Sequence, residues 1–197
     1  MKKSLPLAVI FVVLSAGMAQ AHVGHGSTLG FDHGFMHPIG GVDHVLAMIA
    51  VGVFASVLGG RALWLVPLSF VSMMVAGGML GNSGFHLPIV ETIIALSVII
   101  LGAAVALQWK APVSMAMTLV GLIAVFHGFA HGAEMPTDVS SIAYGLGFVI
   151  ATAALHGAGL GLGLSVRRYL KLFSANVWRI GGSAMAVAGV GLLGGLL

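Results

Sequence analysis

Two short motifs hold most of the side chains in this sequence that could bind a metal ion. The first is HPIGGVDH, residues 37–44, which contributes His37, Asp43 and His44. If Pro38 takes the first helical position, with His37 at the cap, the seven residues from His37 to His44 make almost two turns. Both imidazoles are then expected on one helical face, with Asp43 beside them. This combination of nitrogen and oxygen ligands favours a divalent cation.

The second motif is FHGFAHGAE, residues 126–134. His127 and His131 are four residues apart, which places both rings on one helical face, and Glu134 continues that stripe if the helix persists so far. An H-x-x-x-H spacing is a weak signal by itself. One divalent cation held between the two motifs would explain why so many polar groups gather in them, with Asp43 and Glu134 offsetting its charge.

Other histidines and acids are candidates with competing interpretations. His22, His25 and His33 precede the first motif. They belong either to an arm that captures metal outside the membrane or to a glycine-containing segment that only leads into the first helix. Glu91 is either a further ligand or a negative charge at the start of a helix. An isolated His156 is explained by a neutral imidazole bonded to a neighbouring helix, although an ionisable group within a membrane costs about 2.5 to 3.5 kcal/mol and is a functional candidate by default.

The composition restricts the class of protein whose helices or strands position these residues. Only 7% of the residues are charged, 59% are hydrophobic and the mean hydropathy is +1.11. Soluble domains are about 25% charged, so this chain cannot cover itself with a polar surface, and we expect one integral membrane domain in contact with the lipid bilayer. Because there is no cysteine, disulfides and thiolate metal sites are excluded.

Residues 1–21 have the pattern of a cleavable signal peptide. Lys2 and Lys3 form a basic region, residues 5–16 are apolar, and Ala19-Gln20-Ala21 is an A-x-A cleavage site. The alternative is an uncleaved first helix, but the apolar run is shorter than the roughly 20 residues of a span. Cleavage would leave residues 22–36 as a periplasmic segment that contains histidines.

Six hydrophobic segments follow, and they predict an all-α fold: a polytopic membrane domain over residues 37–197 with six transmembrane helices. The segments are 38–58, 62–80, 87–107, 112–131, 140–164 and 177–197. Each should be helical, because backbone exposed to lipid must satisfy its own hydrogen bonds. Glycine pairs with G-x-x-x-G spacing predict close helix packing at 128 and 132, 157 and 161, 159 and 163, and 191 and 195.

After the leader, the basic residues lie between alternate segments or just inside the last one: Arg61, Lys110, Arg167, Arg168, Lys171 and Arg179. The acids and most histidines fall at the other ends of the segments. By the positive-inside rule this predicts a bacterial inner-membrane protein with the mature N-terminus and the C-terminus in the periplasm. The clustering of basic residues in loops favours this role over nucleic-acid binding.

The two motifs, behind a leader and within six short helices, resemble the HupE/UreJ family of nickel permeases associated with hydrogenase and urease gene clusters. The resemblance spans essentially the whole mature chain. It implies a transporter rather than an enzyme, with Ni²⁺, or else Co²⁺, as the transported ion and no permanently bound cofactor. It also implies uptake from periplasm to cytoplasm for metalloenzyme maturation. By the same resemblance the metal-binding residues are His37, Asp43 and His44 in the first motif and His127, His131 and Glu134 in the second.

Two other functions remain open from the residues themselves. An H-x-x-x-H pair with a further His and Asp can hold Zn²⁺ and activate water, as in an intramembrane hydrolase. Alternatively, His44 and His127 would be axial haem ligands of a b-type cytochrome. Nitrogen and oxygen ligands suit nickel, cobalt or zinc, so the ligand types do not identify the metal. No feature of the sequence identifies a protein partner.

Overall fold

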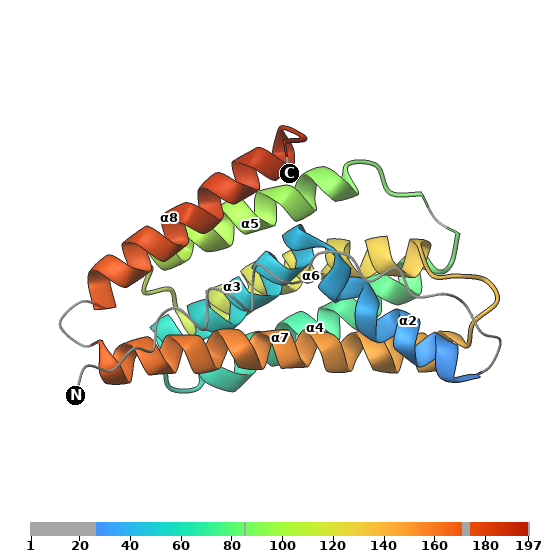
Figure 1. Cartoon of the computed structure of the whole chain (residues 1–197), viewed down its shortest axis with the longest axis horizontal. Helices are drawn as coiled ribbons and strands as arrows, with labels where there is room; N and C mark the ends of the chain where they lie inside the picture. The colour runs from blue at the N-terminus through green and yellow to red at the C-terminus, as the bar shows by residue number, and fades with distance from the viewer. Residues whose placement is uncertain (1–26, 85, 171–173, 197) are drawn as a thin grey trace, which may run out of the picture.

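The computed structural model describes residues 27–84, 86–170 and 174–196, and within them the chain is all helical. The described residues form seven helices, which are α2 (Ser27–Gly40), α3 (Val42–Leu58), α4 (Ala62–Gly81), α5 (Val90–Ala106), α6 (Val113–Ala133), α7 (Ser141–Tyr169) and α8 (Ser174–Leu193) (Figure 1). The all-α prediction is confirmed for these residues, and each predicted hydrophobic segment overlaps a helix. The predicted leader lies outside the described residues.

Three helices, α4, α6 and α7, are long and apolar enough to cross a membrane, and α2 with α3 makes a fourth span if the bent pair is counted as one. The apolar helices α3 and α5 have only 17 residues each. Large hydrophobic side chains such as Trp64, Leu122 and Ile142 are exposed on the helix surfaces. Such an apolar exterior suits contact with lipid.

The first motif does not form one continuous helix, so the prediction that His37 caps a helix beginning at Pro38 is wrong. The helix α2 already begins at Ser27 and includes Pro38, and it meets α3 at a bend of 82°. Gly41 lies between them in an extended conformation (φ −98°, ψ 123°) and caps α3. Two successive glycines have low helix propensity, and Pro38 removes a hydrogen-bond donor from the last turn of α2, so the helix breaks there.

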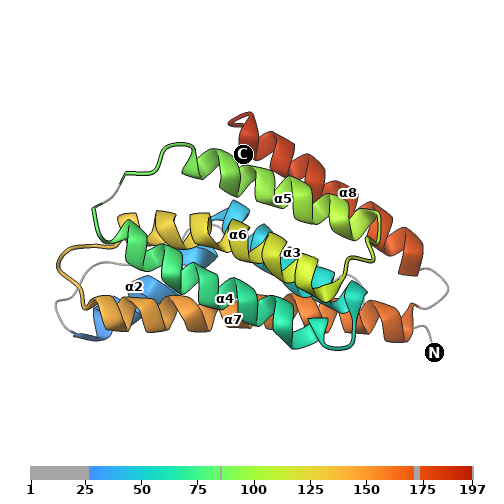
Figure 2. The ribbon, with the colours of Figure 1, turned by 180° about the vertical axis from the view of Figure 1, so that it is seen from behind.

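The helices pack in pairs: α4 against α6, α3 and α2 against α7, and α5 against α8. From behind, α4 lies between α6 and α7 (Figure 2). Glycines make the close approaches, because a Cβ at Gly128 would collide with the Met74 carbonyl and one at Gly159 with the Ile49 carbonyl. The predicted seams at 128 and 132 and at 159 and 163 are confirmed.

The predicted seam at Gly157 and Gly161 is wrong, because a Cβ at either position would meet no atom within 4 Å. A Cβ at Gly195 would likewise meet nothing within that distance. Of the two predicted pairs on α7, only Gly159 and Gly163 meet a neighbouring helix, which is α3.

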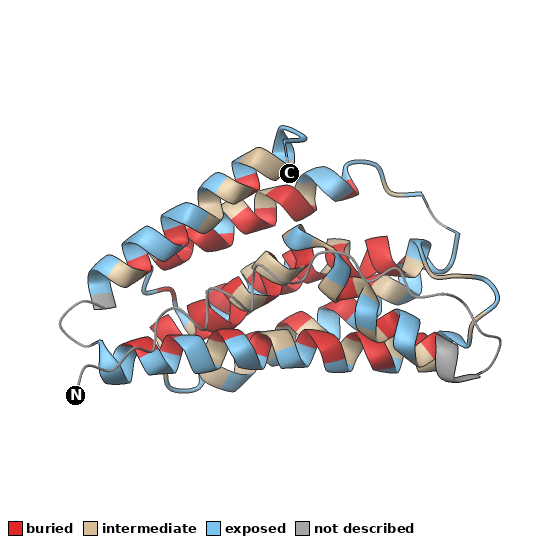
Figure 3. Ribbon diagram, viewed as in Figure 1, coloured by how far each residue is buried: buried red, intermediate tan, exposed pale blue. Residues whose placement is uncertain are grey.

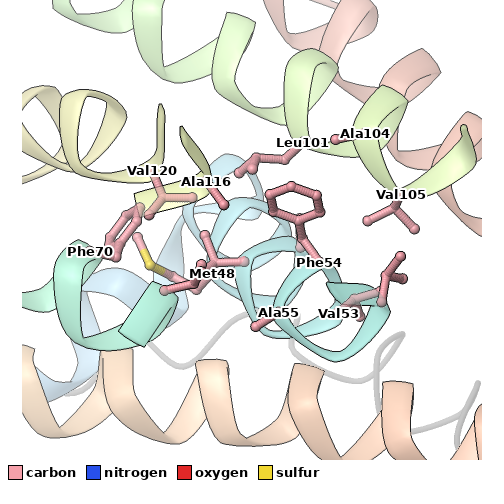
Figure 4. Close-up of a cluster of buried hydrophobic side chains, with 14 of the residues drawn as sticks. Met48, Val53, Phe54, Ala55, Phe70, Leu101, Ala104, Val105, Ala116 and Val120 are labelled. Carbon is pink, nitrogen blue, oxygen red and sulfur yellow. The ribbon is translucent and has the colours of Figure 1, made fainter. Parts of the chain in front are cut away.

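The buried residues form a stripe on each helix that faces the interior of the bundle (Figure 3). The largest hydrophobic cluster joins α3, α4, α5 and α6 around Phe54 and Phe70, both fully buried (Figure 4). Figure 4 places Phe54 near Leu101 and Val105, and Phe70 near Met48 and Val120. This core fixes α3 in the centre of the molecule, where its first turn can meet the other helices.

The helices alternate in direction, so α3, α5 and α7 end at the same side of the molecule at which α4, α6 and α8 begin (Figure 1). Arg61, Lys110 and Arg167 lie at that side. Arg167 Nη1 donates to the Ser56 carbonyl oxygen (2.7 Å) and Lys110 Nζ to that of Val57 (3.4 Å). These cations satisfy the last carbonyls of α3 and complement the negative end of its dipole. The two motifs lie at the other side.

Candidate metal centre

An open cavity of about 510 Å³ lies where α3 and α5 begin and α6 ends. It brings together side chains from four helices. Its lining residues are His33, Met36, His37, Gly40, Gly41, Asp43, His44, Glu91, His131 and Glu134. Seven of the residues predicted from the sequence as ligands therefore share one cavity.

His37, His131 and Glu134 form one group within this cavity, in which His131 is buried and Glu134 is exposed. His37 Nε2 lies 3.0 Å from Glu134 Oε2, and one ligand atom from each of the three residues lies within 4.8 Å of the others. Glu134 caps the C-terminal end of α6, with 55% of its side chain exposed. This group can receive an ion from water.

His44 is held by the carboxylate next to it. Asp43 Oδ1 accepts hydrogen bonds from the His44 backbone N–H (2.8 Å) and from its ring Nδ1 (2.9 Å). The ring therefore presents Nε2, which is buried and has no hydrogen-bond partner within the described part of the chain. Histidines that bind a metal through one ring nitrogen commonly donate the other to a carboxylate in this way.

The absence of a side chain at Gly41 leaves room for the Asp43 and His44 side chains. A Cβ at Gly41 would lie 2.7 Å from Asp43 Oδ1 and 3.0 Å from His44 Nδ1. Its φ of −98° is ordinary for any residue, so the requirement for glycine is steric. The break in the helix and the hydrogen bond from His44 to Asp43 thus depend on the same residue.

His127 is fully buried one turn before His131 on α6. Its Nδ1 lies 3.2 Å from the Ile123 carbonyl oxygen, and since a carbonyl can only accept, Nδ1 is the donor. The unprotonated Nε2 then has no partner among residues 27–84, 86–170 and 174–196. His127 therefore also offers one nitrogen to a ligand.

The four imidazoles form a continuous row from the cavity into the bundle. Ring centroids are 4.7 Å apart for His37 and His131, 4.3 Å for His131 and His44, and 5.1 Å for His44 and His127. Buried polar atoms without partners cost about 1 to 3 kcal/mol each, and a cation bound by several nitrogens would remove that cost. The donor set fits a divalent transition metal.

Helix dipoles and acids set the charge of the cavity. The negative end of the α6 dipole faces it near His131 and Glu134, whereas α3 and α5 present their positive ends. Asp43 and Glu91 lie in the first turns of those two helices and offset the positive ends. Glu91 thus begins a helix and also lines the cavity, and its role as a ligand stays a prediction.

The remaining predicted residues lie elsewhere. His22 and His25 are outside the described residues. His156 is at the middle of α7, 2% exposed, and the predicted hydrogen bond to a neighbouring helix is wrong, because neither of its nitrogens has a partner in the described structure. Its ring contacts Phe70, with 5.1 Å between centroids, and Phe70 contacts His127 at 5.6 Å. The place of Phe70 between two histidines had no signal in the sequence.

A second cavity, of about 410 Å³, lies between α4, α6 and α7 and is almost entirely apolar. His131 borders it as well as the outer cavity. A haem does not fit between its two proposed axial ligands. The rings of His44 and His127 contact each other directly, so a porphyrin cannot lie between them.

Comparisons with known proteins found both a matching family model and a curated relative. The family model described as "HupE / UreJ protein" matches residues 10–192. A curated relative, Protein HupE from Rhizobium leguminosarum bv. viciae, is 45% identical over 195 residues, which cover 99% of this chain and 100% of the relative. No solved structure matches. With a family model over nearly its whole length and a full-length relative at this identity, the chain belongs to the HupE/UreJ family.

Proposed function

We propose that this protein is a permease that carries a divalent transition metal, Ni²⁺ first and Co²⁺ second, across the bacterial inner membrane for metalloenzyme maturation. The observation that carries the proposal is the row of four touching imidazoles, from three helices, that runs inward from an open cavity containing three acids. Membership of the HupE/UreJ family supports nickel over other metals with the same ligand preferences.

The direction follows from the distribution of charge. Arg61, Lys110 and Arg167 lie at the end opposite the metal cavity, and the positive-inside rule makes that end cytoplasmic. The bent pair of α2 and α3 is then the first of six spans. The other five spans are α4, α5, α6, α7 and α8. Both termini are periplasmic, and the cavity faces the periplasm.

Uptake begins with the exposed acids and proceeds by ligand exchange. Glu134 and His37 take the hydrated ion at the cavity surface, and the buried His131 and His44 replace its water. Asp43 fixes the His44 ring and supplies the negative charge that makes a dication tolerable in a medium of low dielectric constant. The metal is therefore a substrate that binds and leaves.

The test is ⁶³Ni uptake by whole cells that lack other nickel permeases. We expect His44→Ala and His131→Ala to abolish uptake at low external nickel while the protein remains in the membrane. His86→Ala is the control, because His86 is an exposed histidine outside the cavity lining. Normal uptake by His44→Ala would mean that the ion does not pass through this cluster.

An intramembrane zinc hydrolase is the second candidate, because the apolar cavity beside His131 could admit a lipid-embedded substrate next to a metal-bound water. The two functions differ in the fate of the ion. In sealed vesicles that contain a metal-sensitive dye, a permease delivers Ni²⁺ to the interior, whereas a hydrolase retains one Zn²⁺ per chain through dialysis and delivers none.

A further inference from the structure

The imidazole at the middle of α7 is buried without any visible structural use. His156 is 2% exposed, and both of its ring nitrogens are without a hydrogen-bond partner in the parts of the chain that the structure describes. Unlike His44 and His127, it has no carboxylate or carbonyl to hold its ring. A buried imidazole in this state destabilises the fold relative to an apolar side chain of the same shape, so its presence calls for a ligand.

Two further donor atoms lie beside it. Thr152 is one turn before His156 on the same face of α7, and its hydroxyl donates to Met74 Sδ across the interface with α4 (3.6 Å). Met74 is in turn one turn after Phe70, whose ring contacts that of His156. Thr152 and Met74 are both almost completely buried. The Thr152 hydroxyl and the Met74 thioether thus contact each other one helical turn from His156, in the interior of the bundle.

The position is deeper than the outer cluster. His156 lies about 22 Å along α7 from its first residue, at 1.5 Å per residue, and is separated from His127 by the single ring of Phe70. The backbone there is fixed, because a Cβ at Gly52 on α3 would collide with the His156 carbonyl. Because the backbones of α3 and α7 are in close contact there, the position of His156 stays fixed while neighbouring side chains rotate.

We propose that His156, Thr152 and Met74 form a second, inner station for the transported metal, which the ion reaches from the outer cluster when the Phe70 ring moves aside. The inference rests on the proposed transport function. The station carries no acid, in contrast to the outer cavity with Asp43 and Glu134. Neutral donors bind a dication weakly, and weak binding is what a transit site needs so that the ion can leave. Imidazole and thioether ligands also suit a late first-row metal.

The experiment measures initial rates of Ni²⁺ and Co²⁺ entry into phosphatidylethanolamine and phosphatidylglycerol vesicles that contain the full-length protein and an internal metal-sensitive dye. We expect His156→Leu to lower the maximal rate at least tenfold and to leave the half-saturating concentration within twofold, because capture by the outer cluster is intact. Thermal unfolding should occur at the same or a higher temperature, since unpaired buried nitrogens are removed. A purely structural role for His156 predicts the reverse, with lower stability.

Shape-preserving variants give the second measurement. Met74→Leu and Thr152→Val should each slow entry severalfold, whereas Met73→Leu, at the neighbouring and partly exposed position on α4, should not. A maximal rate within twofold of the wild type for both His156→Leu and Met74→Leu overturns the inner station. Failure of the transport proposal itself looks different, because wild-type vesicles would then take up no metal at all.

Discussion

Asp43 illustrates how much of the candidate site depends on single contacts. Its carboxylate both offsets charge and holds the His44 ring through the bond to Nδ1. An amide at this position could still accept that bond through its oxygen but would carry no charge. The two roles can therefore be separated by substitution.

Asp43→Asn should weaken metal affinity by about 10 to 100-fold, the usual effect of changing a carboxylate that bonds to a metal-binding histidine. Asp43→Ala should abolish uptake, because the His44 ring is then no longer held in place. Asp138→Asn, an exposed acid outside the cavity lining, is the control. The measurement is ⁶³Ni uptake against external concentration. Equal half-saturating concentrations for Asp43→Asn and the wild type would show that Asp43 does not compensate the charge of the ion.

Gly40 and Gly41 offer a matched pair of substitutions. Alanine at Gly41 would press on Asp43 Oδ1 and His44 Nδ1, whereas alanine at Gly40 would meet no atom within 4 Å. We expect Gly41→Ala to reduce nickel uptake about tenfold, as expected when a site depends on ring orientation, and Gly40→Ala to keep it. Equal uptake by both variants would contradict the steric role of Gly41.

At the scale of the helices, the glycine seams decide which faces meet. Sequence spacing alone gave two overlapping G-x-x-x-G pairs on α7, and only one of them packs against α3. Every helix of a membrane domain is apolar on both its buried and its lipid-facing sides, so hydrophobicity does not distinguish the two faces. The two faces are distinguished by which atoms a Cβ added at each glycine would contact.

Gly159→Ala should therefore separate α7 from α3 and destabilise the protein by about 1 to 3 kcal/mol, the typical cost of overpacking. Gly157→Ala should be neutral or stabilise the helix by about 0.5 to 1 kcal/mol, since alanine loses less backbone entropy than glycine. Thermal unfolding of both purified variants checks this. A larger loss for Gly157→Ala would mean that its open face has a partner in the membrane.

Much of the helical arrangement was accessible from the sequence, because long hydrophobic segments mark where the helices of a membrane domain form. The helix α4, expected at 62–80, spans Ala62–Gly81, and α6, expected at 112–131, spans Val113–Ala133. The break at Gly41 was missed, since Pro38 is compatible with either the start or the last turn of a helix. Both motifs were found, but the placement of Phe70 and His156 depends on packing between distant segments, which local spacing does not encode.

For the whole molecule, the separation of charge predicts orientation. The sequence has no cysteine, so a single introduced cysteine would be the only thiol in the protein that a reagent can label. Asn82→Cys, at the exposed end of α4, should react with a membrane-impermeant thiol reagent on intact cells, and Arg61→Cys should react only after lysis. Labelling of Arg61→Cys on intact cells would invert the orientation and place the metal cavity in the cytoplasm.

The shortness of α3 and α5 has a consequence for the surrounding lipid. Helices of 17 residues are about 26 Å long, less than the roughly 30 Å of hydrocarbon in a typical bilayer. At the outer cavity α3 continues as α2 beyond the bend, whereas among the described residues α5 is not part of such a pair. We therefore expect the bilayer to be thinner beside α5 than beside the longer helices α6 and α7, and shorter-chain lipids should accommodate the protein with less distortion than longer-chain lipids.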